Sequence, residues 1–150
     1  MDWPLVIICG ICLTYIPHLL LRAPAVHLKL ARDKKTGKGG GYDLRAPRAS
    51  QNSAADDSPE GYYIARLNGQ HANSFEGLII LLAALLASVS RGVALETINF
   101  SCTCWLLSRL LHTIFYIFGG GSLAHTFSLL RALSFVVGIV SNLYLLFCCL

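Results

Sequence analysis

Polar side chains of the run Arg66–Glu76 lead without a break into the apolar segment Gly77–Val89. At about 100° per residue, Arg66, Asn73 and Glu76 fall on one side of a helix. The 13 apolar residues rise only about 20 Å, whereas a bilayer core is about 30 Å thick. A helix that crosses a membrane here must therefore draw Asn73 and Glu76 into it. A carboxylate there costs roughly 2.5–3.5 kcal/mol, so we expect Glu76 to face a partner, a ligand or a wet cavity.

A second group of chemically active side chains follows in the next apolar stretch. Arg109, His112 and Tyr116 are spaced i, i+3 and i+7, which places them on one stripe of a helix. Arg131 lies early in the last apolar stretch. A guanidinium group suits bidentate binding of a carboxylate, so this set indicates an anionic ligand. A buried structural ion pair between Arg109 and Glu76, or a polar clamp that only orients a helix bundle, is the alternative interpretation.

The composition is that of a membrane protein. The chain has 150 residues, of which 55% are hydrophobic and 13% charged, whereas a soluble domain carries about a quarter charged residues. Nine of the 12 Lys and Arg residues lie between Arg22 and Arg66. The net charge of +4 is thus confined to one loop and does not indicate nucleic-acid binding. We predict one all-α, four-helix membrane domain over residues 1–150.

Four membrane-spanning helices are predicted from the apolar stretches and their flanking residues. The first begins without a basic region or a small-residue cleavage motif, so we expect a retained helix rather than a signal peptide. Ser58 is a typical N-cap for the second helix, and the glycines from Gly119 should stop the third. The predicted spans are about Trp3–Leu21, Pro59–Ser90, Leu95–Phe118 and Leu123–Phe147.

The basic loop predicts the orientation. By the positive-inside rule, residues 22–66 face the cytoplasm, or the matrix or stroma of an organelle, and both termini lie opposite. The stretch of about 31–57 is polar and glycine-rich, which favours a flexible loop attracted to anionic headgroups over a phosphate-binding loop. The cysteine and histidine spacings predict no metal site.

These motifs carry a resemblance to a known family. The pattern Arg66-x4-His71-x-Asn73-x2-Glu76, followed by Arg109-x2-His112-x3-Tyr116 and then Leu130-Arg131, resembles the MAPEG family, the membrane-associated proteins in eicosanoid and glutathione metabolism. The loop sequence around Tyr42–Arg48 resembles the bacterial-type branch of that family. The resemblance implies a four-helix protomer in a homotrimer, with glutathione bound between neighbouring protomers at the cytoplasmic side.

The resemblance also implies roles for individual residues. Tyr116 or Arg131 would stabilise the glutathione thiolate, and Arg66, Asn73 and Glu76 would position the peptide, with Arg109 and His112 on the corresponding face. The implied activity is a glutathione-dependent transferase or peroxidase acting on a lipophilic electrophile that enters from the lipid. Two departures leave an alternative open. Gly69 replaces a usual arginine and Gly77 replaces a bulkier residue, which fits a non-catalytic subunit of a larger membrane assembly.

Overall fold

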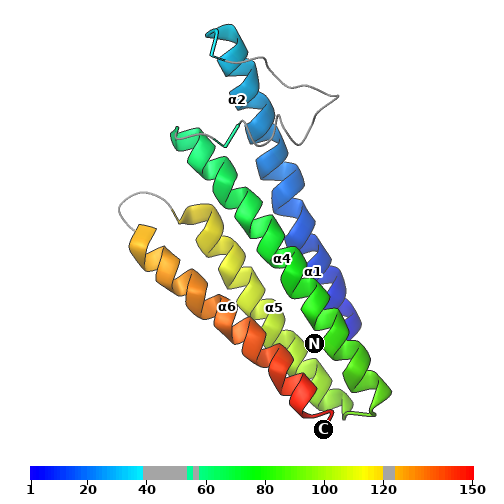
Figure 1. Ribbon diagram of the computed structural model, residues 1–150. Coiled ribbons are helices and arrows are strands. Elements are labelled where there is room, and N and C mark those ends of the chain that lie inside the picture. Colours follow the sequence, from blue (N-terminus) through cyan, green and yellow to red (C-terminus); the bar gives the residue numbers. More distant parts are fainter. Residues whose placement is uncertain (39–53, 56–57, 120–123) are drawn as a thin grey trace. The chain divides into compact units, whose positions relative to one another are not determined.

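Helices account for nearly all of the described chain. The structure is a computed structural model that describes residues 1–38, 54–55, 58–119 and 124–150, and no strand occurs among them. The elements shown in Figure 1 are α1 (Trp3–Pro17), the π-helix η1 (His18–Arg22), α2 (Ala23–Lys35), α4 (Pro59–Ser90), α5 (Leu95–Phe118) and α6 (Ala124–Phe147).

The first helical segment runs well past its predicted end at Leu21. It continues through η1 and α2 to Lys35, so part of the expected basic loop is helical. Two prolines explain the π-helix between them. Pro17 ends α1 and Pro24 stands in the first turn of α2, and neither can donate a backbone hydrogen bond. The N–H of Ala23 bonds instead to the carbonyl of His18, five residues back.

The other three helices confirm the predicted spans. Ser58 caps α4, since its Oγ accepts the backbone N–H of Gly61 at 3.1 Å. At the other end, Gly92 adopts a φ of 69°, and the N–H of Val93 bonds to the carbonyl of Ser88 at 3.0 Å, the geometry of a glycine-terminated helix. Gly119 follows α5 directly, whereas Leu123, the predicted start of α6, lies outside the described residues, as does most of the predicted flexible loop.

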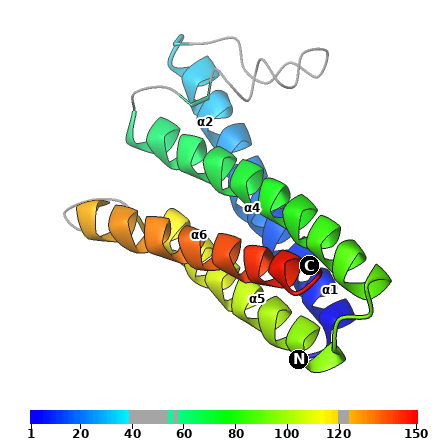
Figure 2. The ribbon, with the colours of Figure 1, turned by 60° about the horizontal axis from the view of Figure 1, so that its bottom comes forward.

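The described chain forms two compact units, and the first contains Met1–Thr14 and Ala72–Leu150. In this unit α5 and α6 run side by side in opposite directions (Figures 1 and 2). Its core collects apolar side chains from four helices around Trp105, which is 1% exposed. The start of α1 is fixed by a hydrogen bond from the backbone N–H of Trp3 to Oδ1 of Asn99 at 2.9 Å. The core also contains Val6, Leu81, Leu85, Cys102 and Leu145.

The second unit, Tyr15–His71, has a smaller apolar core and a polar seam. Arg22 donates from Nε to Oδ1 of Asn68, and the rings of His18 and His71 lie 4.2 Å apart between centroids. Two ion pairs lie toward the C-terminal end of α2. Arg32 pairs with Glu60 at 2.6 Å, and Lys29 pairs with Asp33 at 2.7 Å. The apolar core consists of Val26, Leu30, Ala54 and Ile64.

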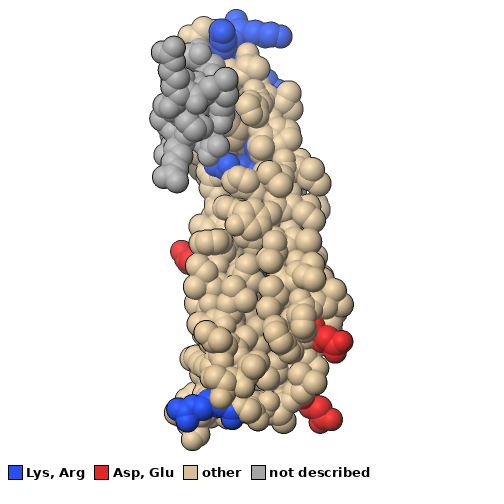
Figure 3. All heavy atoms as spheres, turned by 90° about the vertical axis from the view of Figure 1, so that its right-hand side faces the viewer, with Lys and Arg blue, Asp and Glu red and all other residues tan. Residues whose placement is uncertain are grey.

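The outer surface is that of a protein in lipid. Four of the described helical stretches are long and apolar enough to cross a membrane. Large apolar side chains are exposed along them, including Leu86 at 74% and Phe147 at 70%. Most of the face in Figure 3 carries neither basic nor acidic groups. In water so much exposed apolar surface would cause association, whereas lipid tails solvate it.

Candidate functional site

Tyr116 joins three helices of the first unit. It stands on the last turn of α5, and its hydroxyl oxygen accepts a hydrogen bond from Nδ2 of Asn73 on α4 at 2.9 Å. Arg131 on α6 stacks over the same ring, with its guanidinium carbon 4.4 Å from the ring centroid. The structure therefore brings together three residues that the sequence places far apart.

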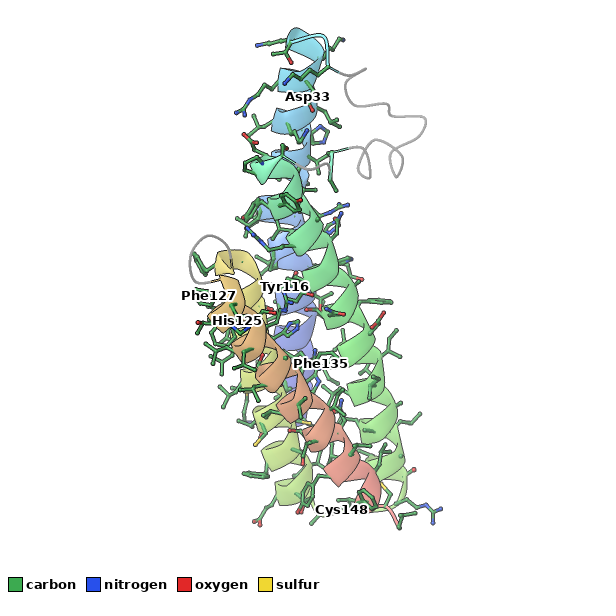
Figure 4. All side chains as sticks on the ribbon, turned by 60° about the vertical axis from the view of Figure 1, so that its left-hand side comes forward. Asp33, Tyr116, His125, Phe127, Phe135 and Cys148 are labelled. Atoms are coloured by element: carbon green, nitrogen blue, oxygen red, sulfur yellow. The ribbon has the colours of Figure 1, made fainter. Side chains whose placement is uncertain are left out.

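A cavity of about 340 Å³ opens at these side chains. This cavity, which we call the Tyr116 pocket, lies in the size range of small-ligand sites. Its lining combines polar and apolar side chains. Figure 4 labels Tyr116 and Phe135, which α5 and α6 contribute to this region. The lining residues are Asn73, His112, Tyr116, Arg131, Ala132, Phe135 and Val136.

Arg131 keeps its charge available in this pocket. The side chain is half-buried and makes one long hydrogen bond, from Nη2 to the Oγ of Ser128 at 3.4 Å on the same helix. It forms no ion pair with any carboxylate of the described residues. A half-buried cation beside a cavity, without an acidic neighbour, is suited to binding an anion from solution.

Arg109 lies behind the pocket rather than in its lining, and its direct contact with a ligand stays a prediction. It is 2% exposed, and its guanidinium lies between two backbones that approach closely because they carry no side chain. A Cβ on Gly77 would stand 2.9 Å from the guanidinium carbon, and a Cβ on Gly138 would stand 2.9 Å from Nη2. Trp105 and Phe135 flank it, with ring centroids 5.8 and 5.0 Å away.

These four neighbours form what we call the Arg109 slot. Within the described residues, Nε and Nη1 of Arg109 have no hydrogen-bond partner. Cation–π attraction to the two rings therefore compensates part of the cost of burying the charge. Phe135 flanks the guanidinium of Arg109 and also lines the Tyr116 pocket, so the buried charge lies close to that pocket.

His112 lies between the slot and the pocket. It is 2% exposed, and its ring centroid lies 4.9 Å from that of Tyr116 and 5.9 Å from that of Phe135. Nδ1 is buried and has no partner among the described residues. The predicted stripe Arg109–His112–Tyr116 thus exists, but only its second and third members line the cavity.

Glu76 does not join the pocket. Its side chain is exposed on the outer side of α4 and forms no ion pair with any described residue. The alternative of a buried Glu76–Arg109 ion pair is therefore wrong for this protomer. Glu76 follows Asn73 by three positions, so the two side chains point about 60° apart around α4. Only Asn73 lines the pocket.

Arg66 belongs to the second unit. There it is half-buried, with its guanidinium carbon 5.7 Å from the ring centroid of Tyr63. Its Nε is buried without a hydrogen-bond partner in the described part of the chain. Its role in ligand binding stays a prediction.

The sequence analysis missed three residues that shape the site. Gly77 was interpreted as a departure from a family pattern, yet it provides the space that Arg109 occupies. Gly138 does the same from α6, and Phe135 connects slot and pocket. The available signal was a glycine inside a helix, which is destabilising by itself and indicates close approach of another group.

Residues 10–150 match the MAPEG family, a stretch that includes every lining residue of the Tyr116 pocket. The chain belongs to the MAPEG family. It is accordingly an integral membrane protein, with four candidate membrane spans among the described residues. Comparisons with curated proteins and with solved structures give no match.

Proposed function

We propose that this MAPEG protein is a glutathione-dependent transferase or peroxidase that acts on a lipophilic electrophile. The observation that carries the proposal is the Tyr116 pocket, where an unneutralised arginine, a tyrosine hydroxyl and an amide face one cavity. MAPEG proteins commonly bind glutathione. This peptide offers two carboxylates for guanidinium groups and a thiol for the hydroxyl donor.

The hydrogen bond between Asn73 and Tyr116 prepares the hydroxyl for this role. Because the oxygen already accepts the amide N–H, its own hydrogen is free to point into the cavity. We infer that it donates to the sulfur of glutathione and stabilises the thiolate, with the nearby charge of Arg131 acting in the same direction. Phe135, Ala132 and Val136 supply the apolar side against which a lipophilic substrate would lie.

The chemical step follows from the thiolate. In a transferase the sulfur forms a bond to an electrophilic carbon, the bond from that carbon to its leaving group breaks, and the leaving group takes a proton. In a peroxidase the sulfur attacks the O–O bond, which releases an alcohol and a sulfenic acid, and a second glutathione converts the sulfenic acid to a disulfide and water. Tyr116 is placed to supply a proton in either case.

A non-catalytic subunit of a larger membrane assembly is the second candidate function. The exposed, unpaired carboxylate of Glu76 favours it, because a lipid-facing charge requires a polar partner from another chain. The same observation supports a homotrimer in which a neighbouring protomer covers Glu76. Native mass analysis under mild extraction should then give trimers, and only monomers would contradict this proposal.

In the orientation that we propose, the C-terminal end of α2 faces the cytoplasm, or the matrix or stroma of an organelle. A Lys38→Cys variant of a chain whose natural cysteines are replaced should be labelled by a membrane-impermeant reagent only from that side of sealed vesicles. Labelling from the opposite side alone would reverse the orientation.

Titration of the purified protein with glutathione tests the enzymatic proposal. We expect a rise in the thermal unfolding midpoint and the ultraviolet absorbance of a thiolate. Arg131→Ala should lower the affinity by about 10- to 150-fold, since a charge-assisted hydrogen bond contributes about 1.5–3 kcal/mol. Lys35→Ala removes one positive charge outside the pocket and is the control. Absence of both signals in the wild type would favour the non-catalytic subunit.

A further inference from the structure

A second, separate cavity lies in the first unit, at the opposite end of α6. Its volume is about 430 Å³, and it lies between the C-terminal ends of α4 and α6. We call it the Arg91 pocket. Cys148, labelled in Figure 4, marks this end of α6. The walls include Ala87, Leu143, Leu146, Phe147 and Cys149.

The two helix ends that frame this pocket are held together by buried contacts. The hydroxyl of Ser88 donates to the carbonyl of Ala84 at 2.8 Å, and it lies 3.5 Å from the carbonyl of Leu145 and 3.4 Å from the sulfur of Cys149. Leu145 and Cys149, which these contacts involve, stand near the end of α6, and Cys149 also lines the pocket. Residues from the ends of α4 and α6 therefore form most of its lining.

Arg91 is the one charged side chain in the lining of this mostly apolar cavity, which also includes Ser90 and Leu150. Arg91 is exposed and follows the last residue of α4. Its guanidinium has no hydrogen bond or ion pair with any described residue. No acidic side chain lines the pocket. An apolar cavity with one free cation at its edge matches an amphiphile that has an alkyl chain and an anionic head.

The position along the helices identifies the environment of that head. Arg91 stands in the short connection between the end of α4 and the start of α5, close to the end of α6. Helices α5 and α6 have 24 residues each, about 36 Å against a hydrocarbon core of about 30 Å, so their ends reach the headgroup layer. Trp3, which bonds to Asn99 near the start of α5, is the residue type expected at that level.

We propose that the Arg91 pocket binds one anionic phospholipid, with the phosphate on Arg91 and an acyl chain against Leu143, Leu146 and Phe147. A phosphate is the anion that the lipid itself supplies at this depth, and a guanidinium binds it bidentately. The lone positive charge favours a head with a net negative charge over a zwitterionic one. This site is separate from the Tyr116 pocket, and it stands whether or not glutathione binds.

The test compares lipid binding to the full-length protein in detergent by native mass spectrometry and thermal unfolding. Phosphatidylglycerol and phosphatidylcholine with identical acyl chains are the probes, and inorganic phosphate is the third. We expect phosphatidylglycerol to bind more tightly, and Arg91→Gln to reduce its affinity by about fivefold to tenfold and remove the preference. Lys35→Gln, which removes an exposed charge from the end of α2, should leave the preference intact.

A blocking variant tests the apolar part of the site. Ala87→Phe should fill the pocket and reduce binding of both lipids while Arg91 remains. Inorganic phosphate alone should give no stabilisation, because the acyl chain provides the larger share of the contact. Equal effects of Arg91→Gln and Lys35→Gln, unchanged binding in Ala87→Phe, or stabilisation by phosphate as large as that by the lipid would each overturn the proposal.

Discussion

Replacing Gly77 by alanine should displace Arg109 from its slot. The added methyl would stand 2.9 Å from the guanidinium carbon and 3.1 Å from Nε, both inside normal contact distance. The guanidinium cannot simply retreat, because the backbone of Gly138 lies on its other side and the rings of Trp105 and Phe135 flank it. Either α4 moves away from α5 and α6, or Arg109 leaves its rings.

The magnitude follows from three opposing effects. Overpacking of a tight interior costs about 1–3 kcal/mol, and weakening two cation–π contacts adds about 0.5–2 kcal/mol. Alanine gains about 1 kcal/mol over glycine in a helix. The variant Gly77→Ala should therefore lose about 0.5–4 kcal/mol of unfolding free energy, although helix propensity alone predicts a gain.

A double-mutant cycle with Arg109→Leu isolates this contact. Without the guanidinium the methyl meets no close atom of that group, so Gly77→Ala in the Arg109→Leu background should be neutral or stabilising by up to about 1 kcal/mol. Unfolding in detergent can be followed by tryptophan fluorescence, to which Trp105 of the slot and Trp3 contribute. If Gly77→Ala has the same effect in both backgrounds, Gly77 does not exist to accommodate Arg109, and our account of the slot fails.

Three further substitutions test the site and the fold. Tyr116→Phe keeps the stack with Arg131 but removes the hydroxyl. We expect kcat to fall about 10²- to 10³-fold, while the glutathione Kd measured by calorimetry changes far less. Equal fold-changes in kcat and in Kd would argue against a role of the hydroxyl in the chemical step. Asn99→Ala removes the acceptor for the backbone N–H of Trp3 and should cost about 1 kcal/mol in chemical unfolding, most of which Asn99→Asp should restore. Gly92→Ala should lower the unfolding free energy by about 1–2 kcal/mol. The left-handed φ is the cause, because the space around a Cβ at this position is open. An unchanged unfolding free energy would show that the turn relaxes freely.

The sequence predicted the helices well where a strong local signal ended each one. The bounds of α4 agree with the prediction because Ser58 caps it and the turn at Gly92 stops it. The first span was predicted too short, since Arg22 and the lysines after it were interpreted as loop. By the usual rule, the prolines at positions 17 and 24 should have ended the helix. The helix continues because a π-helix between them, with the N–H of Ala23 bonded to the carbonyl of His18, accommodates the backbone donors that the prolines lack.

The site was only partly predictable for a different reason. The spacing of residues on one helix gives relative angles, so it placed His112 and Tyr116 on one side of α5 correctly. Spacing does not show which neighbour each side meets. Glu76 and Asn73 were grouped within one arc of the helix. The pocket lies at the edge of that arc, so its lining includes Asn73 but not Glu76. Likewise the depth of Arg109 depends on two glycines from different helices, a contact that no single segment encodes.

The two arginines near the pocket act in different ways, and this difference bears on what the pocket can bind. Arg131 is half-buried and lines the cavity, so its guanidinium can contact a ligand. Arg109 is buried out of contact, so it contributes only a field, which is stronger in a low-dielectric interior than in water. No described carboxylate neutralises either charge. An anion that enters the pocket therefore relieves repulsion as well as forming contacts, and stability becomes linked to ligand concentration. Glutathione at 100 times its Kd should stabilise the protein by about 2.7 kcal/mol, and Arg109→Leu should reduce the affinity that sets this Kd even though it removes no contact to the ligand.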